Sequence, residues 1–180
     1  SIGVITLNTI IDKNTNVSSG KYTYTFDASK VEFKKHKNGD AFDGFMVVVN
    51  NQDAANGTVI ITFANTMPID DEGGVTSIVT FNLKDGVAKG TELYFGLTVD
   101  ELIDDDGTTR KAGQGIGCTY YVGGEQPSPT PTEKPTETPT QAPSPTPGES
   151  IDPNAIKLTN VVVGEEDGVI TLNTINDPNT

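Results

Sequence analysis

The stretch from Lys21 to Asp40 reads KYTYTFDASKVEFKKHKNGD and predicts two β-strands joined by a turn. Aromatic and β-branched residues alternate with polar ones from Tyr22 to Phe26, and the alternation resumes at Val31 and Phe33. A period of two residues places one set of side chains on a buried face and the other set in solvent. The Asn38-Gly39 pair that follows is typical of a tight turn between strands.

The same pattern extends over most of residues 3–124. Further apolar runs, separated by turn pairs such as Asp85-Gly86, are Val4 to Ile10, Phe45 to Val49, Val59 to Phe63, Val75 to Leu83, Leu93 to Val99 and Ile116 to Val122. No segment shows the spacing of an amphipathic helix. We therefore expect an all-β fold, an antiparallel β-sandwich of jelly-roll or immunoglobulin-like type, with about nine strands when it is complete.

The end of the chain repeats its beginning. Residues 168–180, GVITLNTINDPNT, match residues 3–15, GVITLNTIIDKNT, except that Asn176 replaces Ile11 and Pro178 replaces Lys13. A strand-like run precedes the second copy, whereas only Ser1 and Ile2 precede the first. We expect residues 1–124 to form a sandwich that lacks its first strand, and residues 151–180 to form the first two strands of a second copy.

This offset repeat has two interpretations. Either the chain is a window on a longer tandem array, or residues 151–180 complete the next module by donor-strand exchange. Head-to-tail contacts of the second kind produce open filaments. The residues expected to enter the acceptor are the apolar ones of the two strands: Ile156, Leu158, Val161, Val163, Val169, Ile170 and Leu172.

Residues 125–150 have the composition of a linker. Eight of the chain's 11 prolines lie between Pro127 and Pro147, among Ser, Thr, Gln, Glu and Lys, without a large apolar residue. Such a segment cannot bury enough apolar surface to offset the entropy of ordering it, so an extended spacer is expected. Its Pro- and Thr-rich composition also suits O-glycosylation outside the cell.

The charge balance argues against nucleic acid as a partner. The chain has 12 Lys and Arg against 25 Asp and Glu, a net charge of −13, and phosphate backbones are bound by clustered cations. The one basic cluster, Lys30, Lys34, Lys35 and Lys37, is interpreted as a solvated strand edge. No run of about 18 apolar residues occurs, so no membrane span is expected, and the first residues have no signal-peptide pattern.

No catalytic constellation is predicted. His36 stands among lysines without a nucleophile motif and is expected at the surface, and the single Cys118 is expected to be a small core residue. Gly113, Gly115 and Gly117 have the spacing of a phosphate loop, but no helix follows to bind an anion.

Two weaker ligand sites remain open. Asp104, Asp105 and Asp106 offer oxygen ligands to calcium, but they lack the alternate-residue spacing of an EF-hand loop. No metal or cofactor is therefore predicted, and calcium at these three aspartates is the secondary alternative. Tyr94, Tyr120 and Tyr121 offer aromatic faces to a sugar, in a polysaccharide context, although a core or rim role is preferred.

Three stretches resemble cohesin modules. Lys21 to Asp40 is similar to the cohesin strand-turn-strand that ends in Phe-Asp and resumes with Val-Glu-Phe. VIITFANTMPIDDEGGVTSIVTFNLKDGVAKGT, from Val59 to Thr91, resembles the stretch in which an apolar strand ends in Phe-Ala before an acidic-Gly segment. IKLTNVVVGEEDGVITLNTI, from Ile156, is similar to the first two cohesin strands, and the Pro/Thr linker is typical of scaffoldins.

The resemblance implies a nine-stranded jelly roll that docks a dockerin, the calcium-loaded helical module of cellulosomal enzymes, through one sheet face without catalysis. The positions that correspond to the contacting parts of that face are Lys21, Tyr22, Asn50, Asn51, Asp70, Asp71 and Glu72. It also implies a bacterial-type secreted protein, extracellular or attached to the cell surface. The alternative is a repeating subunit of an extracellular filament or surface array, whose partner is a neighbouring copy of itself.

Overall fold

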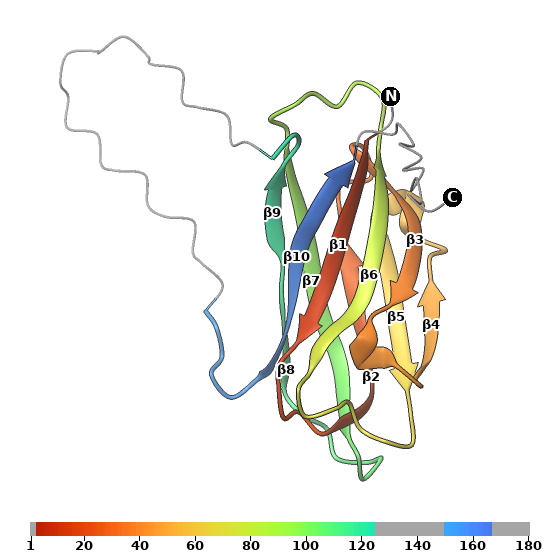
Figure 1. Cartoon of the computed structure of the whole chain (residues 1–180), viewed down its shortest axis with the longest axis vertical. Coiled ribbons are helices and arrows are strands. Elements are labelled where there is room, and N and C mark those ends of the chain that lie inside the picture. Colours follow the sequence, from red (N-terminus) through yellow and green to blue (C-terminus); the bar gives the residue numbers. More distant parts are fainter. Residues whose placement is uncertain (1–2, 125–149, 167–180) are drawn as a thin grey trace, which may run out of the picture.

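The structure, a computed structural model, describes residues 3–124 and 150–166 as two five-stranded sheets packed face to face (Figure 1). The strands are β1 (Val4–Ile11), β2 (Val17–Thr25), β3 (Val31–Asn38), β4 (Met46–Asn50), β5 (Thr58–Ala64), β6 (Gly74–Leu83), β7 (Glu92–Asp104), β8 (Gly113–Ile116), β9 (Cys118–Tyr121) and β10 (Ile156–Glu166). Two single-turn 3-10 helices, η1 (Asp40–Phe42) and η2 (Ala54–Asn56), lie in the connections. The all-β sandwich predicted from the sequence is confirmed.

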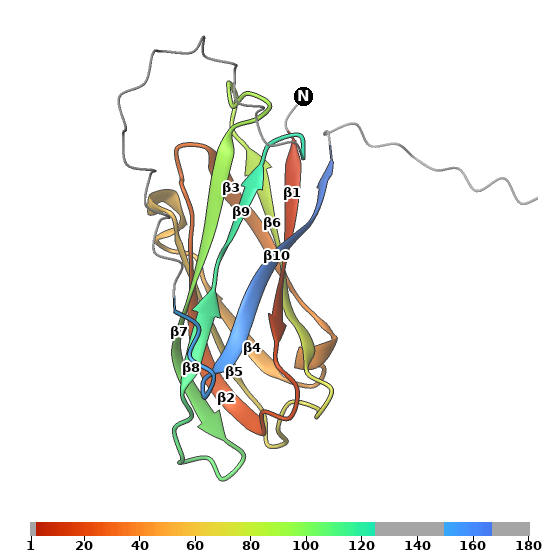
Figure 2. The same ribbon diagram turned by 90° about the vertical axis from the view of Figure 1, so that its left-hand side faces the viewer.

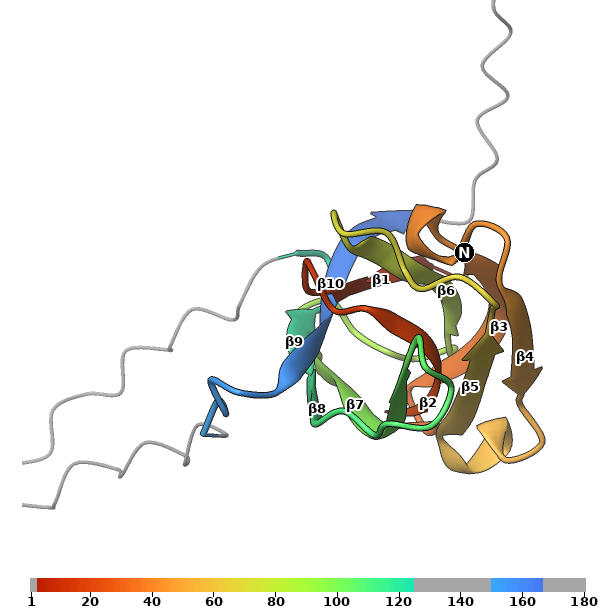
Figure 3. The same ribbon diagram turned by 90° about the horizontal axis from the view of Figure 1, so that it is seen from below.

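We call the two sheets A and B. Sheet A has the order β3-β6-β1-β10-β8, and sheet B has the order β4-β5-β2-β7-β9. All pairs are antiparallel except β10 with β8, which run parallel. The view along the strands shows the two layers enclosing the interior (Figure 3). No helix among the described residues is long and apolar enough to cross a membrane.

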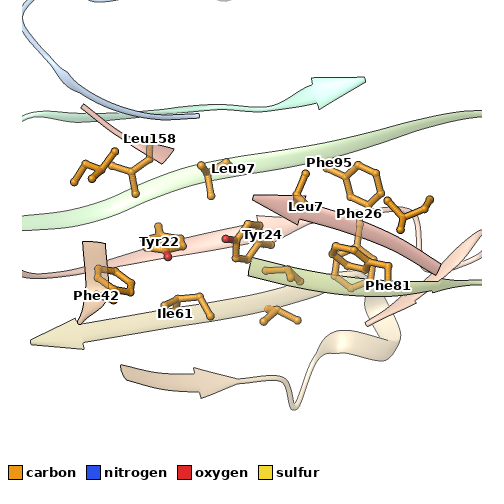
Figure 4. Close-up of a cluster of buried hydrophobic side chains, with 14 of the residues drawn as sticks. Leu7, Tyr22, Tyr24, Phe26, Phe42, Ile61, Phe81, Phe95, Leu97 and Leu158 are labelled. Atoms are coloured by element: carbon orange, nitrogen blue, oxygen red, sulfur yellow. The ribbon is translucent and has the colours of Figure 1, made fainter. Parts of the chain in front are cut away.

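The core lies between the sheets, and its largest fully buried side chains are aromatic rings that pack among aliphatic residues (Figure 4). Alternation along β2 turns Tyr22 and Tyr24 inward, and their rings meet edge to face with centroids 5.6 Å apart. Phe81 of β6 and Phe95 of β7 join the two layers, with ring centroids 5.0 Å apart. Large buried rings in contact provide both apolar burial and a preferred ring geometry, so these residues fix the spacing of the sheets.

The closely spaced glycines of β8 have a packing role. A Cβ added at Gly115 would lie 2.0 Å from the Leu97 carbonyl oxygen of β7, and one added at Gly113 would lie 2.5 Å from Val99 Cγ1. The β8 backbone therefore approaches β7 more closely than any side chain would permit. This contact explains the spacing that resembled a phosphate loop in the sequence.

β3 forms the free edge of sheet A, and it carries the lysine cluster. Lys34, Lys35 and Lys37 are exposed there, and Lys30 lies in the preceding turn. Charged side chains on an edge strand oppose pairing with other chains. The interpretation of this cluster as a solvated strand edge is confirmed.

β10, which follows the Pro/Thr-rich segment, lies inside sheet A between β1 and β8 (Figure 2). It pairs with the whole of β1, from Val4 opposite Glu166 to Ile11 opposite Leu158. The segment expected to begin a second copy thus occupies a strand position of the sandwich formed by residues 3–124. Residues 167–180, with Val169, Ile170 and Leu172, lie outside the described residues, so their role stays a prediction.

The face of β10 that enters the core differs from the one expected. Leu158 is fully buried, whereas Val161 and Val163 are 39% and 54% exposed on the outer face of sheet A. The prediction that Val161 and Val163 enter the core is wrong, because the strand alternates and the polar Asn160 occupies the inward position beside them. Ile156, by contrast, packs against the core, as expected.

Candidate docking face

The outer face of sheet B is a broad surface formed by β4, β5, β2 and β7, and we call it the docking face. Strand pairing aligns its outward residues in rows across the sheet. One row contains Val48, Thr62, Lys21 and Glu101, and a second contains Asn50, Ile60, Thr23 and Thr98. Side chains in such a row lie about 4.5–5.5 Å apart at Cβ and present a continuous surface.

An apolar patch lies at the β4 side of this face. Met46 is 73% exposed and Val48 is 56% exposed, although both lie within a regular strand. Ala64, opposite Met46 on β5, is exposed as well, and Ile60 is partly exposed. The inward residues of β4, Val47 and Val49, pack against the core, so the outward pair is not needed for folding.

The opposite side of the docking face is polar. The Thr23 hydroxyl donates a hydrogen bond to Asp100 Oδ2 at 2.7 Å, and Glu101 forms an ion pair with Arg110. Lys21 lies between these groups and the apolar patch and is exposed. The face therefore offers an apolar anchor at one side and paired or single charges at the other.

Three of the residues predicted for partner binding lie on or beside this face. Lys21 is central, and Asn50 ends β4 with its side chain accepting a hydrogen bond from the Gln52 backbone N–H at 3.1 Å. Asn51 follows in the exposed turn after β4. Their role in binding stays a prediction, but the fold places their side chains where a partner can reach them.

Tyr22 cannot contribute its side chain to such a contact. It is completely buried, because alternation along β2 turns Tyr22 inward when Lys21 points outward. Its hydroxyl hydrogen-bonds to Ser77, and burial raises the pKa of Tyr22 to about 12. The assignment of Tyr22 as a surface contact is wrong.

Asp70, Asp71 and Glu72 lie at one end of the sandwich, away from the rows of the docking face. The Asp71 carbonyl oxygen accepts a hydrogen bond from the Asn14 N–H at 2.8 Å, and Glu72 forms a 2.9 Å ion pair with Lys13. These contacts hold the acidic loop against the turn between β1 and β2. The three side chains are exposed, so they remain candidates for a contact at the rim of the face.

A polar network crosses the core beneath the docking face. His36 of β3 hydrogen-bonds through Nε2 to Ser77 Oγ at 2.7 Å, and Ser77 in turn bonds to the Tyr22 hydroxyl. Burial lowers the pKa of His36 to about 4. His36 was expected at the surface; it is instead partly buried, because its ring reaches over β6 to Ser77.

Two of the three aspartates considered for calcium, Asp104 and Asp106, already have protein partners for their carboxylates. Asp104 Oδ1 accepts hydrogen bonds from Asn16 Nδ2 and the Asp105 N–H, and lies 3.6 Å from Lys111 Nζ. Asp106 accepts hydrogen bonds from the Thr109 hydroxyl and from the backbone N–H groups of Thr109 and Thr108, which hold the pKa of its carboxyl at about 2, below its usual range. Among residues 3–124 and 150–166, no group of three or more His, Cys, Asp or Glu side chains is arranged to hold a metal ion. Calcium binding at this loop stays a prediction.

Two features escaped the sequence analysis. The outward orientation of Met46 and Val48 could have been found only by knowing which residue of the MVVVN run faces the core, since the run itself has no polar alternation. Asn160, buried in an apolar strand, carried a clearer signal, because an amide in a core position needs specific partners. Those partners lie on β1 and β7.

No family model matches this sequence, and no curated protein matches it. Similar solved structures exist, and they include several cohesins. A non-cellulosomal cohesin from the archaeon Archaeoglobus fulgidus is 16% identical with a TM-score of 0.55, covering 66% of this chain and 80% of its own. The seventh ScaB type I cohesin from Pseudobacteroides cellulosolvens is 18% identical with a TM-score of 0.51, covering 71% and 97%.

A third similar structure is a complex of CaCohA2 with a point variant of CaDoc0917. The matched chain of this complex is 19% identical with a TM-score of 0.52, and the match covers 66% of this chain and 89% of that one. CaCohA2 comes from Clostridium acetobutylicum. At this level of identity the similarity shows the fold. The chain has the cohesin jelly-roll sandwich, as the resemblance in the sequence implied.

Proposed function

We propose that this chain is a non-catalytic protein-interaction module that docks a dockerin-type partner through the face formed by β4, β5, β2 and β7. The observation that carries this proposal is the exposure of Met46 and Val48 on a regular strand of that face. Contiguous apolar surface with a polar border is typical of protein-binding sites. Four strands, with three spacings of about 4.8 Å, give a width of about 14 Å, enough to seat a helix of about 10–12 Å diameter.

The surroundings of the patch support a protein partner over a small substrate. The carboxylates of this face described above are engaged by protein groups, Asp100 by the Thr23 hydroxyl and Glu101 by Arg110. The similar structures include CaCohA2 in complex with a CaDoc0917 variant. The Pro/Thr-rich composition of residues 127–147 and the sequence repeat favour an extracellular, scaffold-type protein with several modules.

The test is calorimetric titration of the 180-residue chain with a panel of dockerin-type domains in calcium-containing buffer. Met46→Asp together with Val48→Asp should reduce affinity at least about tenfold, because charge replaces the apolar anchor. Val161→Asp together with Val163→Asp is the matched control, since both residues are exposed on the outer face of sheet A. Absence of binding across the panel, or equal loss in both double variants, would contradict docking through this face.

A second candidate function is a structural one, as the repeating subunit of an extracellular filament or surface array. The observation in its favour is that β10, from beyond the Pro/Thr-rich segment, lies within the sandwich of residues 3–124. A strand with such a remote connection can be supplied by a neighbouring chain. Regular filaments of the purified chain in negative-stain micrographs, lost in a Leu158→Asp variant, would support this function; their absence at high protein concentration would contradict it.

A further inference from the structure

We propose that β10 is an exchangeable strand, and that the slot between β1 and β8 accepts residues Ile156–Glu166 either from its own chain or from a second copy of the chain. This proposal rests on the second candidate function above and specifies its interface. It concerns sheet A, and is therefore independent of the docking face on sheet B.

Both strands that border the slot, β1 and β8, have β10 as a hydrogen-bonded neighbour in sheet A. β10 pairs antiparallel with β1 and, through residues 156–159, parallel with Gly113–Ile116 of β8. Without β10, both neighbours would present unpaired backbone groups at a sheet edge, which is the arrangement that recruits a strand from another molecule. The core would also be opened at Leu158, which is fully buried among the residues of both sheets (Figure 4).

Asn160 makes the slot specific for this strand. It is 2% exposed and lies on the inward face of β10. The Thr9 hydroxyl of β1 donates to its Oδ1 at 2.8 Å, and its Nδ2 donates to the Phe95 carbonyl oxygen of β7 at 3.2 Å. One amide therefore bonds to a strand of each sheet.

A shift of the strand would break these bonds. Moving β10 by one residue would turn Asn160 outward and bring Lys157 or Thr159 to the core side. Buried polar groups left unpaired cost stability, so Asn160 selects a single register. At the far end, Glu165 adds a second fixed point by accepting a 2.6 Å hydrogen bond from the Gly123 N–H and one from the Tyr120 hydroxyl.

The sequence repeat provides β10 with more than one acceptor. Residues 169–175 are identical to residues 4–10, so the partner of Asn160 recurs as Thr174. Both copies therefore carry the apolar residues that correspond to Val4, Ile5, Leu7 and Ile10 and the hydroxyl of Thr9, and they differ within the β1 range only where Asn176 replaces Ile11. A β1 strand has no means of distinguishing β10 of its own chain from β10 of another copy.

Mass action decides which arrangement is populated. A tethered strand acts at an effective concentration of the order of millimolar, so a chain at about 10 μM closes on itself, as in the present structure. Intermolecular exchange should rise as the protein approaches about 1 mM, or when chains are held together at a surface. This concentration dependence is the measurable signature of the proposal.

The test uses a disulfide across the slot. Asn8 of β1 and Val161 of β10 are directly opposite one another and lie on the outer face, so Asn8→Cys with Val161→Cys can be bridged without disturbing the core. Cys118→Ser removes the native thiol. Labelled and unlabelled chains are mixed, unfolded, refolded at about 10 μM and about 1 mM, oxidised, and analysed by non-reducing electrophoresis and mass spectrometry.

We expect intrachain bridges at the low concentration and mixed-label, interchain bridges at the high one. Intrachain bridges alone at both concentrations would overturn the proposal. The single-cysteine variants control for random oxidation, and equal interchain product from them would also overturn it. If the first pair does not fold, Thr6→Cys with Gly164→Cys tests the same pairing, since these residues are opposite one another as well.

The outcomes separate this proposal from the two functions above. Interchain bridges without filaments would support strand exchange and contradict the filament role, because two chains can also close into a swapped dimer. The affinity of the Met46/Val48 double variant for dockerin-type domains is measured separately, and it depends neither on interchain bridges nor on filaments.

Discussion

The Thr9 hydroxyl donates a hydrogen bond to Asn160 Oδ1 at 2.8 Å, in a completely buried contact between residues separated by 151 positions in the sequence. The Tyr24 hydroxyl bonds to the same Thr9 oxygen, so the pair connects β10 with the aromatic core of sheet B. Since β10 follows the Pro/Thr-rich segment, this contact is the point at which the end of the chain becomes part of the first sandwich.

The first prediction concerns the coupling of this pair. Asn160→Leu should destabilise the chain by about 1–3 kcal/mol, because it leaves Thr9 and the Phe95 carbonyl without their buried partner. Thr9→Val should destabilise by a similar amount, and the double variant by less than the sum. Urea denaturation of the four proteins measures the coupling; strictly additive changes would show that the two side chains do not interact.

The second prediction distinguishes the two faces of β10. Leu158→Ala should cost about 2–5 kcal/mol, because the side chain is fully buried and a cavity would replace it. Val163→Ala on the same strand is more than half exposed and should change stability by less than about 0.5 kcal/mol. A larger loss of stability for Val163→Ala than for Leu158→Ala would mean that the strand is turned the other way.

Alternation was enough to predict the sandwich, but not which residues of every strand face the core. In β2 the YTYTF run has polar residues between the aromatic ones, so its inward set could be predicted directly. In β10 the run VVV has no such contrast, and the inward position next to it is held by an amide. Tertiary partners on β1 and β7 decide the orientation there, and these are invisible from the local pattern.

The candidate site was predictable to a similar extent. Lys21 was assigned from the resemblance to cohesins, and alternation along β2 agrees with it, because a polar residue beside inward tyrosines faces solvent. The same alternation should have excluded Tyr22. The acidic loop at Asp70–Glu72 has no strand period, so its place at the end of the sandwich depends on contacts with the β1–β2 turn. Met46 and Val48 became candidates only when the register of β4 against β5 showed which side they occupy.

The third prediction concerns charge on the docking face. Lys21→Glu adds a second acidic group to the row that contains Glu101, in a chain that is already strongly acidic. If the partner presents acidic groups near this row, association should slow by about threefold to tenfold at low salt, with a smaller change at high salt. Lys35→Glu on the free edge of sheet A is the matched control, and stopped-flow association rates measure both variants. An equal effect of the two variants would show that only net charge matters.

The last prediction is a pH dependence of stability that originates at His36. The pKa of this imidazole is lowered by burial from 6.5 to about 4, so the native state keeps the ring neutral where the unfolded chain takes up a proton. The stability contributed by neutral His36 is therefore fully present above pH 6.5 and is lost as the pH falls towards 4. Between about pH 7.5 and about pH 5 the loss should be about 1–2 kcal/mol, allowing for the partial exposure of the ring.

His36→Gln is the control for this effect, because glutamine can still bond to Ser77 but does not titrate. Urea midpoints of both proteins at the two pH values measure the difference, and the carboxylates, which titrate mostly below this range, contribute equally to both. The wild-type midpoint should fall relative to the variant on acidification. Parallel midpoints would mean that His36 takes up its proton equally well in the folded and unfolded chains, and that its contact with Ser77 does not exclude the charged ring.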